Sequence, residues 1–293
     1  MFNISVLQEP ETVAAAVAQL HANERLRVIA GGTDVLIRLQ HGADGWSELL
    51  SLRRIPGLGE IRMRDDGTIV IGATATFTRI FQDPVVRKHL QILSEAAVSM
   101  GGPQVRNVAT VGGNLCNGAT SGDSAAPLFA LDALLRLESF EGERIIPIAE
   151  FYAGPGKVHL RSGELLTAIL VPRAGYQGTG GHYIKFAQRK AMDIATLGVA
   201  AVCRVRDGRF EDLRIGLGVA APTPIRCPEA EAYAKGRPVD GETLREIGKL
   251  AVKPSRARTS WRASKDYREH LIEVLSERAV AEAAKRAGGL RAE

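Results

Sequence analysis

The chain contains Ala30-Gly31-Gly32-Thr33-Asp34 and, 80 residues later, Thr110-Val111-Gly112-Gly113-Asn114. These two stretches decide the fold prediction, and we call them the first and second glycine loops. Each follows an apolar run typical of a strand and places two glycines beside hydroxyl, amide or carboxylate side chains. Glycine has no Cβ, so such loops let backbone N–H groups come close to a phosphate. The pair predicts a long ligand held from two sides, and a dinucleotide fits better than a mononucleotide.

The composition indicates an ordinary globular protein. The 293 residues are enough for two domains or three small ones, and 45% are hydrophobic while 24% are charged. The net charge of +5 is too small to indicate nucleic-acid binding, and aromatic residues at 5% leave little for base stacking. A basic surface that faces an acidic partner subunit explains the charge at least as well. We therefore expect no nucleic acid among the partners.

Cysteine usage and hydropathy indicate a cytoplasmic protein. The three cysteines, Cys116, Cys203 and Cys227, form no CxxC pair, which favours a reducing compartment over a disulfide framework. An iron–sulfur cluster ligated wholly by this chain is not expected, because such clusters normally need four thiolates. No secretory signal is recognised at the N-terminus, and no apolar run approaches the roughly 20 residues of a membrane span.

The pattern along the chain alternates strands and helices before a separate C-terminal part. A strand at 26–30, the first glycine loop and a helix at 35–39 form a strand–turn–helix unit, the usual setting for a phosphate. Residues 101–127 carry six glycines and few positions for a core, so we expect an irregular, functional segment. Residues 175–181 predict a linker. Beyond it, three strands and two helices, at 241–252 and from 264 to the end, indicate an α+β domain.

The remaining motifs exclude several kinds of chemistry. Gly216-Leu217-Gly218-Val219-Ala220-Ala221 has dinucleotide-fingerprint spacing, but Pro222 and Pro224 would break the helix that must follow, so we interpret it as structural. The six histidines show no metal-ligand spacing, and no GxSxG nucleophile is present. We therefore expect no catalytic nucleophile and no metal site in this chain.

Two groups of cations leave alternatives open. Lys185 and Arg189 follow the predicted linker and either bind the far end of the ligand or lie on a solvated strand edge. The segment 253–268 carries six basic residues around Trp261. This segment is either a solvated helix face or a subunit contact, and the mixture of Arg and Trp favours the contact because such mixtures are enriched at interfaces.

The chain resembles a known family at several motifs. Its two glycine loops, extended to 30–36 and 110–118, resemble the FAD-binding loops of the medium subunit of molybdenum hydroxylases. Three later motifs match as well: Ala191-Met192-Asp193-Ile194-Ala195-Thr196, Val219-Ala220-Ala221-Pro222-Thr223-Pro224-Ile225-Arg226 and Ser260-Trp261-Arg262-Ala263-Ser264-Lys265. The resemblance runs nearly end to end and is strongest to the bacterial xanthine dehydrogenase type. A cysteine-rich insert found in the hydroxybenzoyl-CoA reductase relatives is missing.

This resemblance implies an α+β fold. Residues 1–175 would form a two-subdomain FAD-binding region of the vanillyl-alcohol-oxidase (PCMH) type, and residues 181–285 a smaller α+β domain like that of the CO dehydrogenase flavoprotein. No histidine lies in the matched loops, so the FAD would be noncovalent. The family motifs place FAD contacts at Arg27, Val28, Ile29, Ala30, Gly31, Gly32, Thr33, Asp34, Ala109, Thr110, Val111, Gly112, Gly113, Asn114, Asp123, Leu165 and Lys185.

The resemblance also implies a function as an oxidoreductase subunit. FAD would pass electrons from the 2Fe–2S clusters of a partner subunit to NAD, while the molybdenum cofactor of another partner oxidises xanthine or hypoxanthine. The loop at 189–194 would receive the nicotinamide. The alternative is the medium subunit of another molybdenum hydroxylase, such as the carbon monoxide or aldehyde dehydrogenase type, because the partner subunit sets the substrate.

Overall fold

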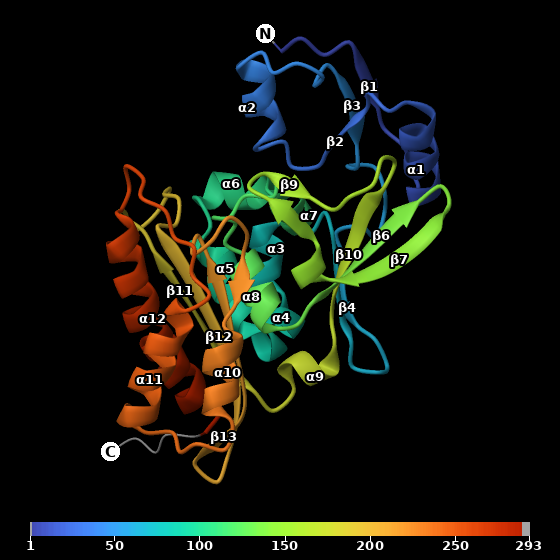
Figure 1. Cartoon of the computed structure of the whole chain (residues 1–293). Helices are drawn as coiled ribbons and strands as arrows, with labels where there is room; N and C mark the ends of the chain where they lie inside the picture. The colour runs from blue at the N-terminus through green and yellow to red at the C-terminus, as the bar shows by residue number, and fades with distance from the viewer. Residues whose placement is uncertain (1, 289–293) are drawn as a thin grey trace.

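The computed structural model describes residues 2–288 and shows three parts that follow one another along the chain (Figure 1). A small first subdomain lies at the top of the view, a second subdomain occupies the centre and right, and a C-terminal domain lies at the left. Met1 and residues 289–293 lie outside the described residues, and so does the predicted end of the last helix.

The first subdomain is a three-stranded parallel sheet with two helices. Its sheet order is β1 (Val6–Gln8), β3 (Glu48–Ser51) and β2 (Arg27–Ile29), and its helices are α1 (Val13–Ala22) and α2 (Val35–Gln40). Thr12 begins α1, because its side-chain oxygen accepts a 3.0 Å hydrogen bond from the Ala15 N–H. The predicted strand–turn–helix unit is confirmed: β2, the first glycine loop and α2 follow one another.

The second subdomain is built on a five-stranded antiparallel sheet. The sheet order is β4 (Ile61–Met63), β5 (Ile69–Gly72), β10 (Leu165–Val171), β6 (Leu134–Ser139) and β7 (Gly142–Pro147). All seven residues of the central strand β10 are buried, as expected for an apolar run covered on both faces. The packed helices are α3 (Phe77–Gln82), α4 (Pro84–His89), α5 (Gln91–Ser99), α6 (Pro103–Val108), α7 (Val111–Cys116) and α8 (Ala125–Ala130). Short connecting elements are η1 (Ile148–Glu150), β8 (Tyr152–Gly154), β9 (Lys157–Val158) and α9 (Arg173–Tyr176).

The C-terminal domain is an antiparallel sheet with its own helices on one face, and its other face packs against α5 and α8 of the second subdomain. Its strands are β11 (Gly180–Phe186), β12 (Leu197–Arg206), β13 (Arg209–Gly218) and β14 (Ile225–Arg226), in that order. Its helices are α10 (Pro228–Ala234), α11 (Gly241–Val252) and α12 (Lys265–Arg286). Alternate β12 side chains face opposite cores: Val199 and Ala201 pack with α11 and α12, whereas Ala200 and Val202 join the core of the second subdomain. The two parts therefore share one continuous packed body.

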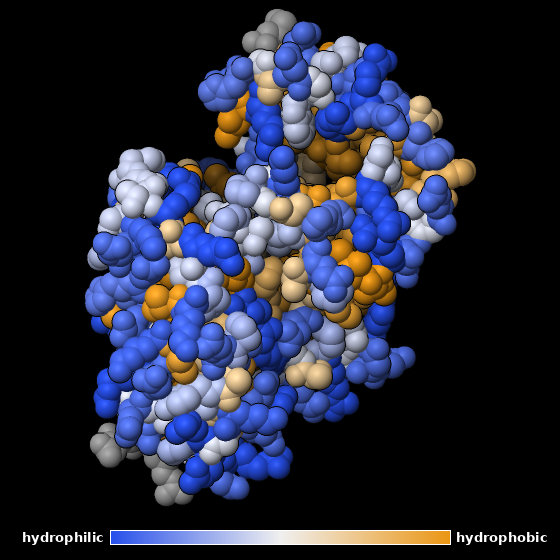
Figure 2. All heavy atoms as spheres, in the orientation of Figure 1, coloured by the Kyte–Doolittle hydropathy of each residue, from blue (hydrophilic) through white to orange (hydrophobic). Residues whose placement is uncertain are grey.

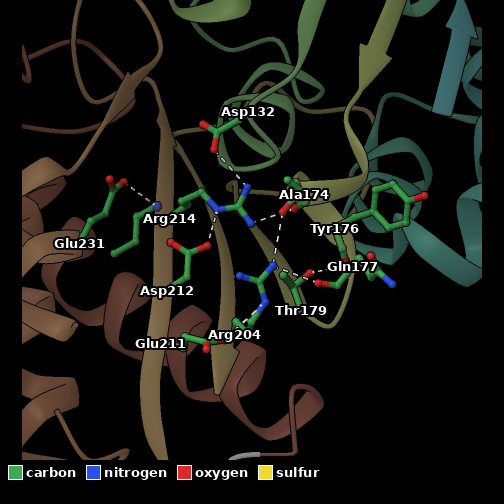
Figure 3. A network of polar contacts seen from close by, with 12 residues as sticks. Asp132, Ala174, Tyr176, Gln177, Thr179, Arg204, Glu211, Asp212, Arg214 and Glu231 are labelled. Carbon is green, nitrogen blue, oxygen red and sulfur yellow. Dashed lines mark hydrogen bonds and ion pairs between the residues drawn. The ribbon is translucent and has the colours of Figure 1, made fainter. Parts of the chain in front are cut away.

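An ionic network also fastens the C-terminal sheet to the second subdomain (Figure 3). The guanidinium of Arg214, a buried residue of β13, donates to Asp212 at 3.0 Å, to Asp132 at 3.2 Å and to the Gly175 carbonyl at 2.9 Å. Arg204 of β12 donates to the Gln177 carbonyl at 3.0 Å. Asp132 and Gly175 precede the C-terminal sheet in the chain, so the network fixes the angle at which that sheet packs.

Two sequence predictions around the second glycine loop are corrected here. The run before the second glycine loop is the helix α6 rather than a strand, because Pro103 begins a helix at the position where its missing N–H is not needed. Residues 101–127 contain α6, α7 and the start of α8, whereas 117–124 are irregular as expected, and every residue of α8 is buried. The small residues that suggested a loop allow close packing instead: a Cβ on Gly216 of β13 would lie 2.2 Å from the Ala126 carbonyl oxygen. The interpretation of Gly216 as structural is confirmed.

The predicted linker is also packed. A Cβ on Gly175 would lie 2.3 Å from the Leu131 carbonyl oxygen, and one on Gly180 would lie 2.1 Å from the Ala283 carbonyl oxygen. These glycines therefore serve close approach between backbones rather than flexibility. The last helix, α12, ends at Arg286 within the described residues.

Candidate functional site

The structure brings the two glycine loops together. A Cβ on Gly31 would lie only 1.9 Å from the carbonyl oxygen of Val108, the residue before Ala109, so the backbones touch there. Beyond this contact, Asn117 Nδ2 donates to Asp34 Oδ1 at 3.0 Å, and Arg38 of α2 donates to Asn117 Oδ1 at 3.0 Å. Segments far apart in sequence therefore form one wall where the two subdomains meet, and Figure 2 shows the surface hollowed beneath the upper lobe.

The first glycine loop presents a row of unused donors. Within residues 2–288, the N–H groups of Gly31, Gly32, Thr33 and Asp34 have no hydrogen-bond acceptor. Gly32 is buried and has a φ of +75°, which favours glycine and turns the row of amides. Gly32 alone is buried in this row, and a buried donor is nearly always paired in native proteins, whereas its neighbours are partly or fully exposed. Successive main-chain amides of this kind suit an anionic group such as a pyrophosphate.

The second glycine loop uses its amides internally. The N–H groups of Val111 and Gly112 donate to the carbonyls of Ala75 at 3.0 Å and Ala73 at 2.8 Å, and Gly113 donates to the Thr110 hydroxyl at 3.1 Å. Thr110 thereby begins α7 as its N-cap residue. These glycines hold the loop against the end of β5. Phosphate donors from main-chain amides would therefore come from the first loop.

A buried charged cluster lies between α5, α8 and β11. Asp123 is only 6% exposed, and its carboxylate accepts from Lys185 Nζ at 2.8 Å and from the Tyr183 hydroxyl at 3.0 Å. Lys185 Nζ also donates to the Ser99 carbonyl at 3.1 Å. Burial raises the pKa of Asp123, and the ammonium and the phenol oppose that shift. Lys185 and Asp123 therefore form a buried ion pair, and the solvated-edge alternative for Lys185 is wrong.

A cavity of about 300 Å³ opens directly beside Lys185. Ser99 and residues 187–191 line it together with Asp193. The loop keeps its shape because Asp193 accepts from the Arg189 N–H at 2.9 Å, and Met192, with a φ of +53°, donates its N–H to the Gly101 carbonyl at 3.3 Å. Met192 and Ile194 are about half exposed. The cavity lining therefore contains three cations, Lys185, Arg189 and Lys190, while the exposed apolar side chains of Met192 and Ile194 belong to the same loop.

Three other residues that the sequence predicts as FAD contacts, Leu165, Arg27 and Asn114, do not line the cavity beside Lys185. Leu165 is buried in the apolar core of the first subdomain, where Val28 packs partly against it, rather than in the core around the cavity. The Arg27 guanidinium donates to the carbonyls of Glu24 at 2.8 Å and Leu26 at 3.3 Å. Asn114 Oδ1 accepts from the Ser124 hydroxyl at 2.6 Å.

Sequence reasoning missed Tyr183 and Asn117. Tyr183 lies two residues before Lys185 on β11 and so shares its face of the strand, which the period of two could have revealed. Asn117 ends α7 and links the two glycine loops, a role that no local pattern predicts.

Among the helices of residues 2–288, none is both long and apolar enough to cross a bilayer.

Comparisons with known proteins agree with this architecture. Residues 2–174 match the family described as the FAD binding domain in molybdopterin dehydrogenase, and residues 182–283 match the CO dehydrogenase flavoprotein C-terminal domain. The xanthine dehydrogenase FAD-binding subunit of Escherichia coli O157:H7 is 43% identical over 289 residues, which cover 99% of each chain.

Solved structures are similar over almost the whole chain. Carbon monoxide dehydrogenase from Hydrogenophaga pseudoflava is 30% identical with a TM-score of 0.92, covering 98% of this chain and 99% of that one. Quinoline 2-oxidoreductase from Pseudomonas putida 86 is 25% identical with a TM-score of 0.92, covering 99% and 100%. The predicted fold class, an FAD-binding region followed by an α+β flavoprotein domain, is confirmed. The chain belongs to the FAD-binding medium subunits of the molybdenum hydroxylase family.

Proposed function

We propose that this chain holds FAD noncovalently and passes electrons from the 2Fe–2S clusters of a partner subunit to NAD, within a complex that oxidises xanthine or hypoxanthine. The observation that carries the FAD site is the row of unpaired amides at Gly31–Asp34, set against the start of the second loop. Whole-length identity of 43% to a xanthine dehydrogenase FAD-binding subunit supports the purine assignment.

The proposed cofactor contacts follow the loops and the buried cluster. The first-loop amides would bind the pyrophosphate, because they are unpaired and turn together. The second loop would shape the other wall, since its glycines bring the backbone close. The full proposed set is Arg27, Val28, Ile29, Ala30, Gly31, Gly32, Thr33, Asp34, Ala109, Thr110, Val111, Gly112, Gly113, Asn114, Asp123, Leu165 and Lys185.

The side chains of this chain would orient and polarise the bound FAD and would not react themselves. FAD, when bound, exchanges electrons singly or in pairs, so it links one-electron clusters to a two-electron acceptor. Lys185 offers a fixed ammonium at the cavity, and Asp123 holds that ammonium in place from behind. The loop at 189–194, part of which lines the cavity, would exclude water and receive the nicotinamide beside this charge. No proton transfer by a side chain of this chain is required.

The domain limits and the location belong to the same proposal. We place the FAD-binding region at 1–175 and the C-terminal domain at 181–285, limits that enclose the two segments, 2–174 and 182–283, that match the two family models. The cysteines in residues 2–288 are free thiols, which suits the cytoplasm. The proposed partners are the molybdenum-binding and 2Fe–2S subunits of the complex.

A second candidate is the medium subunit of a carbon monoxide or aldehyde dehydrogenase. The similarity to carbon monoxide dehydrogenase, with a TM-score of 0.92, supports it. Purifying the native complex through a tag on this chain decides between the two. Xanthine-dependent reduction of NAD supports the first proposal, whereas carbon monoxide or aldehyde oxidation without xanthine activity overturns the purine assignment. A complex that oxidises xanthine but reduces only artificial acceptors overturns the NAD assignment.

A further inference from the structure

The basic segment that the FAD site does not use lies beside the cavity loop. This segment, residues 253–268, consists of the connection between α11 and α12 and the first turn of α12. Gln188, which lines the cavity, donates its Nε2 to the Arg262 carbonyl at 3.3 Å. A ligand that leaves the cavity across Gln188 therefore meets this segment first.

The arginines of this segment have no acidic partner. Within residues 2–288, Arg256, Arg258, Arg262 and Arg268 form no ion pair with a carboxylate. Arg268 is only 3% exposed, and its guanidinium donates to the Thr196 carbonyl and to the Ser260 hydroxyl, which are both neutral. The Nε atoms of Arg262 and Arg268 are buried and unpaired. A buried guanidinium without an anion is rare, because such charges are normally paired.

The cations also repel one another. Burial lowers the pKa of Arg268, and the charges of Arg258 and Arg262 lower it further. A bound anion would remove this repulsion and give the exposed guanidinium groups a partner. Phosphate suits them, because the planar fork of arginine matches phosphate oxygens in pairs.

Trp261 adds a flat surface to the cluster. Its side chain is 77% exposed, and the Arg262 guanidinium stacks 4.2 Å from the centre of its ring. A stacked arginine fixes the orientation of the indole. The ring can then stack a purine base, a contact that tolerates any base and needs no hydrogen bond.

We propose that Arg258, Trp261 and Arg262 bind the adenosine diphosphate half of the dinucleotide acceptor. The arginines would contact the phosphates and Trp261 the adenine, while the nicotinamide half occupies the cavity lined by residues 187–191. This inference rests on the proposed transfer to NAD and names where the rest of that ligand lies. The position of Gln188 between the cavity and Arg262 makes the two halves continuous.

The test uses the FAD-loaded full chain and ADP-ribose as the probe. Isothermal titration measures the Kd of ADP-ribose for the wild type, Arg258→Ala, Arg262→Ala and Trp261→Ala. We expect each arginine variant to weaken binding about tenfold, since a charge-assisted hydrogen bond is lost. Arg237→Ala is the matched control, because Arg237 is also exposed and stacks 4.0 Å from the Tyr233 ring, and its Kd should stay within about twofold. Inorganic phosphate should bind more weakly than ADP-ribose.

Several results would overturn this inference while leaving the proposed function intact. One is the absence of ADP-ribose binding in a chain whose FAD is still reduced by NADH. Another is equal weakening by Arg237→Ala, which would mean a diffuse charge effect. A third is unchanged ADP-ribose binding with loss of partner-subunit association in Arg258→Ala, which would assign the arginines to a subunit interface. If the wild-type chain neither binds ADP-ribose nor has its FAD reduced by NADH, the NAD proposal itself is refuted.

Discussion

Gly31→Ala perturbs the closest backbone approach between the first glycine loop and the residues just before the second. Its Cβ would lie 1.9 Å from the Val108 carbonyl oxygen and 2.6 Å from the carbonyl carbon. These are backbone atoms, so the loops must separate by about 1 Å, and overpacking of this kind costs about 1–3 kcal/mol. The shift moves the row of unpaired amides away from the opposite wall. If the whole cost falls on the bound state, FAD affinity drops by about 5- to 150-fold.

The assay is a titration of the apoprotein with FAD, followed by flavin absorbance, alongside thermal unfolding by circular dichroism. Gly154→Ala is the matched control, because its Cβ meets no atom within 4 Å and its φ is not in the left-handed region. We expect Gly154→Ala to bind FAD like the wild type. Wild-type FAD affinity in Gly31→Ala would refute the assignment of this contact to the cofactor site.

Three further predictions concern charged side chains that are buried or half-buried. Lys185→Met should destabilise the protein by about 3–5 kcal/mol in denaturant unfolding, because it leaves Asp123 buried without its cation; adding Asp123→Asn should recover much of that loss, and no recovery would argue against the pairing. Burial of Glu95 would raise its pKa, but hydrogen bonds from His182, the backbone and an arginine outweigh it and leave the pKa below the ordinary 4.5. The ionised carboxylate therefore stabilises the folded state above about pH 4.5, and this stabilisation is lost as the pH falls through the lower pKa of the folded state. In Glu95→Gln, the free energy of unfolding should fall less steeply as the pH is lowered. An unchanged fall at acid pH would contradict the lowered pKa. Arg214→Met should cost about 1–3 kcal/mol, because its aspartate partners are partly exposed, and should separate the unfolding of the two halves in calorimetry. A single unaltered transition would show that the network does not join them.

Local patterns in the sequence predict much of the fold. The apolar run 165–171 matches β10, and residues 241–252 match α11, where Leu244, Ile247 and Ala251 recur at helical spacing and are buried. The strand–turn–helix unit around the first loop depends only on neighbouring residues, so it too is predictable. The short helix α10, by contrast, has too few residues for a periodic pattern to develop.

The candidate site depends on contacts that no local pattern encodes. Glycine pairs mark both loops, but only the structure shows that the first leaves its amides unpaired and that the second uses them. Glycine and alanine within 101–127 suggested an irregular loop, although small side chains equally permit close packing, as at α8. Arg268 belongs to a segment expected to be solvated or exposed at an interface, yet it is buried under its own chain.

The most direct test of the proposed electron transfer is anaerobic mixing of the FAD-loaded chain with NADH. NAD reduction is reversible, so NADH should bleach the flavin absorbance at about 450 nm, with about one FAD reduced per chain. Dithionite serves as the positive control for reducible flavin. Flavin that dithionite bleaches but NADH leaves oxidised, in both the isolated chain and the assembled complex, would contradict the account.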